Sequence, residues 1–74
     1  MPPRPNPFLR AVGGLVRQQR IRHGLSQEAL ADEAGVDRSY MSGVERGVRN
    51  LSILKLRAIA RALRVATRDL IPTE

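Results

Sequence analysis

The chain has 74 residues, which is enough for one domain, and it contains no cysteine, so disulfides and thiolate metal sites are excluded. Its 13 Lys and Arg residues against 7 Asp and Glu residues give a formal net charge of +6. So large an excess of positive charge on so small a domain favours a polyanionic partner, such as nucleic acid, over a merely solvated surface.

Residues 1–7 hold four of the five prolines, so this segment is predicted to be an extended arm ahead of a domain at 8–74. The arm is either a free tail or, through Arg4, a segment that follows DNA. No apolar stretch reaches the roughly 18–20 residues that cross a bilayer, and no signal peptide is recognisable. We therefore expect a cytoplasmic protein with no membrane partner.

A first helix is predicted over residues 8–23, because side chains recur there at the three- and four-residue spacing of one helix face. These residues are Phe8, Val12, Leu15, Val16 and Gln19. Gly24 follows where a left-handed residue commonly ends a helix. The adjacent Gly13 and Gly14 are expected to weaken the first turns of this helix by about 1 kcal/mol each.

Two short helices follow, each with a polar cap before it and a glycine after it. Ser26 is the predicted N-cap of a helix that runs to about Ala34 and ends at Gly35. Asp37 is the predicted N-cap of the next helix, which ends at Gly47. The residues expected to face inward are Leu30, Ala31, Ala34, Met41 and Val44.

Ser52 is the predicted cap of a fourth helix, in which apolar residues recur at spacings of 3, 4 and 3. These residues are Ile53, Leu56, Ala60 and Leu63. Thr67 is expected to cap a last helical turn or two ending at Pro72. No segment alternates with the period of a strand, so the fold class is all-α, a compact domain of five helices.

Two short capped helices joined by a three-residue turn are typical of a helix-turn-helix. From about Val16 to Ile71 the chain resembles the Cro- and phage-repressor-like helix-turn-helix regulators. The matching residues are Gly24-Leu25-Ser26-Gln27, Leu30-Ala31, Gly35-Val36, Glu45-Arg46-Gly47 and Leu56. The stretch from Asp37 to Asn50 is most similar to the controller proteins of restriction–modification systems. The resemblance implies a lambda-repressor-like DNA-binding domain with helices 2 and 3 as the helix-turn-helix.

The resemblance also implies which residues touch DNA. Base contacts are expected from the outer side of the third helix, where an arginine fork suits O6 and N7 of guanine. The base-contacting residues are Arg38, Ser39, Ser42 and Gly43. The residues on the DNA backbone or at the groove edge are Gln27, Tyr40, Arg46, Arg49 and Asn50. Two alternatives remain open: Tyr40 packs on the domain instead, and Arg49 enters a minor groove.

Other charged residues have different implied roles. Arg20 and Glu45 match a partly buried structural ion pair that joins the first helix to the third. Glu28 and Asp32, four residues apart, form a candidate patch for the sigma subunit of RNA polymerase. Two departures from the family pattern are Gln19, where Leu is usual, and Arg64, where Gly normally ends the fourth helix.

The sequence thus predicts a transcriptional regulator that binds a pseudo-palindromic operator in double-stranded DNA as a homodimer, with its third helix in the major groove. The expected dimer interface comprises Leu51, Val65, Leu70 and Ile71. An enzyme is not expected, since His23 is the only histidine and no serine has a recognisable base partner; nor is a metal or other cofactor expected. The alternative is an antitoxin-type or other protein-interaction module that binds DNA only for autoregulation.

Overall fold

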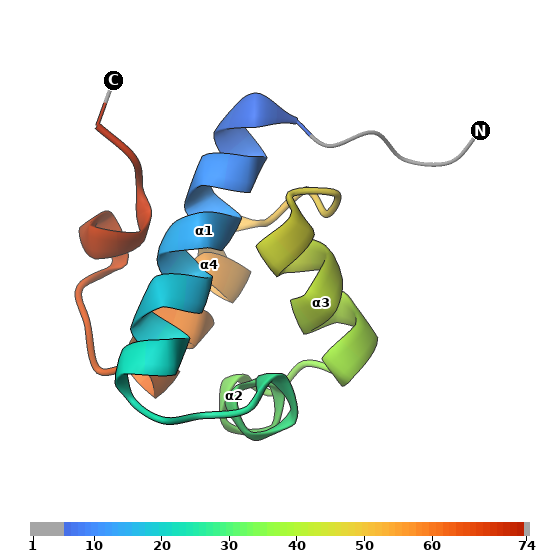
Figure 1. The fold of residues 1–74 in the computed structure, drawn as a ribbon, viewed down its shortest axis with the longest axis vertical. Helices are drawn as coiled ribbons and strands as arrows, with labels where there is room; N and C mark the ends of the chain where they lie inside the picture. Colours follow the sequence, from blue (N-terminus) through green and yellow to red (C-terminus); the bar gives the residue numbers. More distant parts are fainter. Residues whose placement is uncertain (1–5, 74) are drawn as a thin grey trace.

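The computed structural model describes residues 6–73, and these contain four α-helices, one short 3₁₀ helix and no strand. The elements are α1 (Pro7–Arg22), α2 (Gln27–Ala34), α3 (Arg38–Arg46), α4 (Ile53–Ala62) and the 3₁₀ helix η1 (Thr67–Leu70). Figure 1 shows α1 and α3 side by side and running in opposite directions, with α4 behind them and α2 at one end. The all-helical helix-turn-helix fold is therefore confirmed. Residues 1–5 of the expected arm lie outside the described residues, so the division at residue 8 stays a prediction.

The first helix begins at a proline that is held by the residue before it. Oδ1 of Asn6 accepts hydrogen bonds from the backbone N–H groups of Phe8 and Leu9, at 2.9 and 3.1 Å. Pro7 suits the first helical position because it has no N–H to leave unpaired and its φ is already helical. The backbone N–H of Asn6 also donates to the carbonyl of Gly47, at 3.1 Å, so the start of α1 is tied to the end of α3.

The predicted caps of the three later helices are confirmed. Oγ of Ser26 accepts from Ala29 N–H at 3.0 Å, and Oγ of Ser52 accepts from Lys55 N–H at 3.0 Å. Asp37 caps α3 in the same way. At the other ends, the glycines after α2 and α3 have φ of 74° and 75°, the left-handed conformation that ends a helix without strain.

The fifth helix is the part of the fold prediction that was wrong. Residues 67–70 form a single 3₁₀ turn, and Thr67 is its first residue rather than its cap. The backbone N–H of Ala66 donates to Oδ2 of Asp69 at 3.1 Å, which closes the turn. Ile71 is already extended, as expected for a residue before a proline, so the turn cannot grow into an α-helix.

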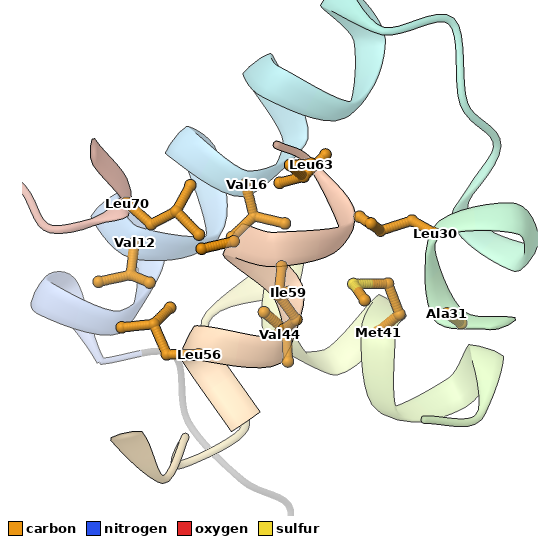
Figure 2. Close-up of a cluster of buried hydrophobic side chains, with 11 residues drawn as sticks. Val12, Val16, Leu30, Ala31, Met41, Val44, Leu56, Ile59, Leu63 and Leu70 are labelled. Atoms are coloured by element: carbon orange, nitrogen blue, oxygen red, sulfur yellow. The ribbon is translucent and has the colours of Figure 1, made fainter. Parts of the chain in front are cut away.

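Eleven buried apolar residues from all five elements form one core, and Val16 and Ile59 lie at its centre in Figure 2. The members are Val12, Val16, Leu30, Ala31, Met41, Val44, Leu56, Ile59, Ala60, Leu63 and Leu70. Two predicted core residues are wrong, because Phe8 is 42% exposed and Ile53 is 80% exposed. Each stands in the first turn of its helix, where the spacing continues but the structure places no core beneath it.

Backbone contact between α1 and α3 explains one of the two central glycines. A methyl group at Gly13 would overlap the backbone carbonyl oxygens of Val44 and Glu45, so only glycine permits this crossing. Gly47 makes a second close approach, since a Cβ there would lie 2.6 Å from Cα of Arg10. The predicted weakness at Gly13 is thus accompanied by tight packing, whereas Gly14 has open space beside it.

Candidate nucleic-acid interface

The amino end of α3 points away from the core. Arg38 and Ser39 are exposed, while Met41 and Val44, on the opposite side of the helix, are fully buried. Arg38, Ser42 and Arg46 recur every fourth residue, so with Ser39 they make up one outward side of α3, which we call the reading face. Arg46 is exposed and Ser42 half-buried. Nothing in the described residues covers the first turn of this face.

The cap of α3 also engages Ser39 on the reading face. Oδ1 of Asp37 accepts from Tyr40 N–H at 2.7 Å and from Oγ of Ser39 at 2.9 Å. These hydrogen bonds, the backbone one first, hold the pKa of the Asp37 carboxyl below its usual value. Because Ser39 donates its hydroxyl hydrogen to Asp37, it presents an acceptor outward.

Gly43 does not belong to the reading face, contrary to the sequence prediction. It is buried, and a Cβ built on it would lie 2.7 Å from Cγ of Arg49. The reason is that the chain turns back after α3, where Val48 N–H donates to the Gly43 carbonyl at 3.0 Å. The returning loop lays the Arg49 side chain across Gly43, so the missing side chain makes room for an arginine rather than for a ligand.

Tyr40 packs on the domain, and Arg49 covers its ring. The ring is half-buried against the core, with the Arg49 guanidinium carbon 5.4 Å from its centroid. Partial burial raises the pKa of the Tyr40 hydroxyl, and the Arg49 charge acts in the opposite direction. The hydroxyl therefore remains a protonated donor at neutral pH, at the edge of the reading face.

The ion pair expected between Arg20 and Glu45 is present, and it has a third member. Nε and Nη2 of Arg20 donate to Oε2 and Oε1 of Glu45, at 2.7 and 3.1 Å. The Gln27 side-chain amide donates to the same Oε1 at 3.1 Å, a contact that sequence reasoning missed. The Arg20 side chain is 13% exposed and that of Glu45 4%. The cluster joins α1, α2 and α3, and it fixes the predicted phosphate ligand Gln27 beside the reading helix.

The remaining predicted DNA residues lie where the resemblance implies. Arg49 and Asn50 are exposed in the loop after α3, and Gln27 is half-buried in the first turn of α2. Glu28 and Asp32, the candidate polymerase patch, are exposed on α2. The structure does not test the contacts of these residues with DNA or polymerase.

The predicted dimer interface needs a correction. Leu70 is fully buried, because η1 turns it inward against the core, and so it cannot meet a second chain directly. Leu51 and Val65 are half-buried against the same core, and Ile71 is 42% exposed. The most exposed large apolar side chains are instead Ile53, at 80%, and Leu54, at 72%.

Within residues 6–73 no group of three or more His, Cys, Asp and Glu side chains is arranged to hold a metal ion. None of the described helices combines the length and the apolar character that a membrane span requires.

Residues 16–70 match the helix-turn-helix family HTH_3. The chain is 43% identical over 60 residues to "Control protein C.BamHI" of Bacillus amyloliquefaciens, a match that covers 80% of this chain and 74% of that protein. It is 39% identical to the transcriptional regulator SlrR of Bacillus subtilis, but spans only 42% of that longer protein.

Two solved structures extend the likeness to three dimensions. The restriction–modification controller protein C.AhdI of Aeromonas hydrophila superposes with a TM-score of 0.87 at 44% identity, covering 89% of this chain and 100% of that one. C.Esp1396I, solved bound to a 19-base-pair DNA duplex, gives a TM-score of 0.78 at 36% identity, covering 85% of this chain and 84% of that one.

Proposed function

Because this chain belongs to the helix-turn-helix family HTH_3, we propose that it regulates transcription by binding a specific site in double-stranded DNA. The observation that carries the proposal is the outward, charged amino end of α3, where Arg38 and Ser39 are exposed and the opposite side is anchored in the core. Its similarity to C.BamHI and C.AhdI places the proposed regulation among restriction–modification controllers.

In the proposed complex α3 lies in the major groove, which is wide enough for a helix. The Arg38 fork donates to O6 and N7 of a guanine, and Ser39, whose hydrogen is held by Asp37, accepts from an amino group of cytosine or adenine. Ser42 lies one turn further along the same face. The phosphate contacts come from Gln27, Arg46, Arg49 and Asn50, and Tyr40 donates from the edge.

A homodimer is the second part of the proposal, since one domain of this size reads too few base pairs to be specific in a genome. The structure favours the start of α4 as the contact, where Ile53 and Leu54 are exposed next to the half-buried Leu51. Replacing Ile53 and Leu54 together by Glu should give a monomer by light scattering. Ile21→Glu is the matched control, because Ile21 is also apolar and 58% exposed but lies at the end of α1.

We further propose that Glu28 and Asp32 contact a basic surface of the polymerase sigma subunit when the protein activates transcription. Both carboxylates are exposed and separated by one helical turn of α2. Replacing both with Lys should abolish activation from a reporter promoter and leave the affinity for DNA unchanged. Activation at the original level would reject this contact.

Selection of bound duplexes from random-sequence DNA tests the function as a whole. We expect an inverted repeat whose half-sites lie about one helical turn, roughly 34 Å, apart. An unrelated mixture of sequences would contradict specific binding. Recovery of a stoichiometric protein partner on purification would favour the antitoxin-type alternative.

A further inference from the structure

A groove between α1 and the end of α3 lies next to the reading face, and arginines dominate its lining. The residues that line it are Arg10, Gly14, Arg17, Glu45, Arg46 and Val48. Its volume is about 560 Å³, much more than the roughly 30 Å³ that one water molecule occupies in the liquid. The groove therefore has room for a ligand group, and its lining shows which chemistry that group should have.

Close backbone packing brings the arginines of two helices together. Gly13 and Gly47 let α1 and α3 approach with no side chain between them, and the Asn6–Gly47 hydrogen bond holds the start of α1 there. Arg10, Gly14 and Arg17 share one side of α1, because they are four and then three residues apart. Arg46, in the last turn of α3, completes the rim. Gly14 leaves the floor of the groove open.

The charge of the groove is strongly positive. Its three arginines are exposed, and among the described residues none of them forms an ion pair. The one acid in the lining, Glu45, is 4% exposed and already accepts hydrogen bonds from Arg20 and Gln27. Three like charges around one groove repel each other, and an anion placed among them would remove that repulsion.

We propose that this groove binds a phosphate of the DNA backbone, in addition to the phosphates contacted by Gln27 and the loop after α3. Guanidinium groups suit phosphate because their planar N–H forks match its oxygens. DNA is favoured over a free anion because Arg46 belongs both to the groove and to the reading face, so the positive surface is continuous. This inference rests on the proposed function, and Arg10 and Arg17 are its new ligands.

Charge-matched variants test the proposal on the duplex recovered by selection. Arg10→Gln with Arg17→Gln should lower the slope of log affinity against log salt by about 0.9 for the lost phosphate. Arg57→Gln with Arg61→Gln removes the same charge from exposed positions on α4, and it should leave the slope near that of the unchanged protein. Equal slopes for the two pairs would overturn the inference.

A scan of the duplex, with one phosphate at a time replaced by neutral methylphosphonate, identifies the contact. The unchanged protein should lose affinity at each phosphate that it binds. The Arg10→Gln/Arg17→Gln variant should become insensitive at one of these positions in each half-site and stay sensitive at the others. Sensitivity retained at every position would contradict the proposal.

A variant without a charge change separates shape from electrostatics. Gly14→Leu should fill the floor of the groove, keep the domain folded by circular dichroism, and reproduce the loss at the same phosphate. Sensitivity at that phosphate retained in folded Gly14→Leu would count against the groove. So would binding of inorganic phosphate alone at millimolar concentration, which would indicate a small-anion site. If the unchanged protein bound no duplex, the proposed function itself would fail, which is a distinguishable result.

Discussion

The side-chain amide of Gln27 donates to Oε1 of Glu45, at 3.1 Å, and the same oxygen accepts from Nη2 of Arg20. The first residue of α2, the middle of α1 and the last turn of α3 are thereby joined through one nearly buried carboxylate. A contact to phosphate at Gln27 would therefore fix the depth at which α3 enters the groove. Stability and recognition meet at Glu45, although its side chain is too deeply placed to touch DNA.

Removing one partner of this cluster should destabilise the domain. Glu45→Gln should lower the free energy of unfolding by about 3 kcal/mol, because it leaves the Arg20 charge largely buried without its counter-ion. Arg20 keeps its hydrogen bond to the Leu25 carbonyl, so the loss should lie at the low end of the range for broken pairs. Urea denaturation measures it. A double replacement, Arg20→Met with Glu45→Leu, should recover most of the loss; a single-variant loss below about 1 kcal/mol would contradict the interpretation.

The adjacent glycines of α1 should respond in opposite directions to the same substitution. Gly13→Ala should destabilise the fold by about 2–3 kcal/mol, because its methyl group meets two backbone carbonyls of α3 that cannot move independently. Gly14→Ala should stabilise it by about 0.5–1 kcal/mol, since the position is open and helical. Thermal unfolding of both variants decides the matter. The same sign for both would show that α1 and α3 are not in backbone contact.

Arg64 is the one non-glycine residue with positive φ, 58°, among those described, and it follows the C-cap of α4. Arg64→Gly should relieve strain of about 1 kcal/mol. For a domain of this size the melting temperature should rise by roughly 4–8 °C. Arg61→Gly, one turn earlier in a right-handed helix, should lower it instead. An unchanged or lower melting temperature for Arg64→Gly would mean that the left-handed conformation costs nothing here.

Stability should fall in acid partly through Asp37. The pKa of its carboxyl is lowered below the usual value near 3.8 in the folded chain, mainly by the hydrogen bond from Tyr40 N–H. The contribution is therefore complete above that usual value and is lost as the pH falls through the folded pKa. Asp37→Asn keeps an acceptor for the cap and should flatten the dependence of the urea midpoint on pH between about 2 and 5. An identical pH profile for both proteins would exclude Asp37 as a contributor.

Local chemistry made much of the fold predictable. Ser26, Asp37 and Ser52 cap the helices expected of them, because a cap depends only on the residues of one turn. The Arg20–Glu45 pair was expected from the resemblance, and the periodicity of α4 located Leu56, Ala60 and Leu63 correctly in the core.

The errors all depend on what lies opposite a residue, which spacing does not show. Ile53 continues the apolar repeat of α4 but stands beyond the core, whereas Leu70 is drawn into it by a turn too short to predict as 3₁₀. Gly43 was placed toward DNA because the return of the loop, and with it Arg49, could not be read from the helix alone. The bond from Gln27 to Glu45 joins residues 18 apart in the chain, and no local pattern marks it.

The most direct test of base reading by α3 is the affinity of Arg38→Ala and Gln27→Ala for the selected operator and for each of its single-base-pair variants. Arg38→Ala should lose about 1–3 kcal/mol on the operator and cease to discriminate at one base pair of each half-site, while Gln27→Ala weakens every duplex by the same factor. If both variants weakened all duplexes alike, so that every base preference survived without Arg38, the amino end of α3 would not be the part of this protein that reads DNA.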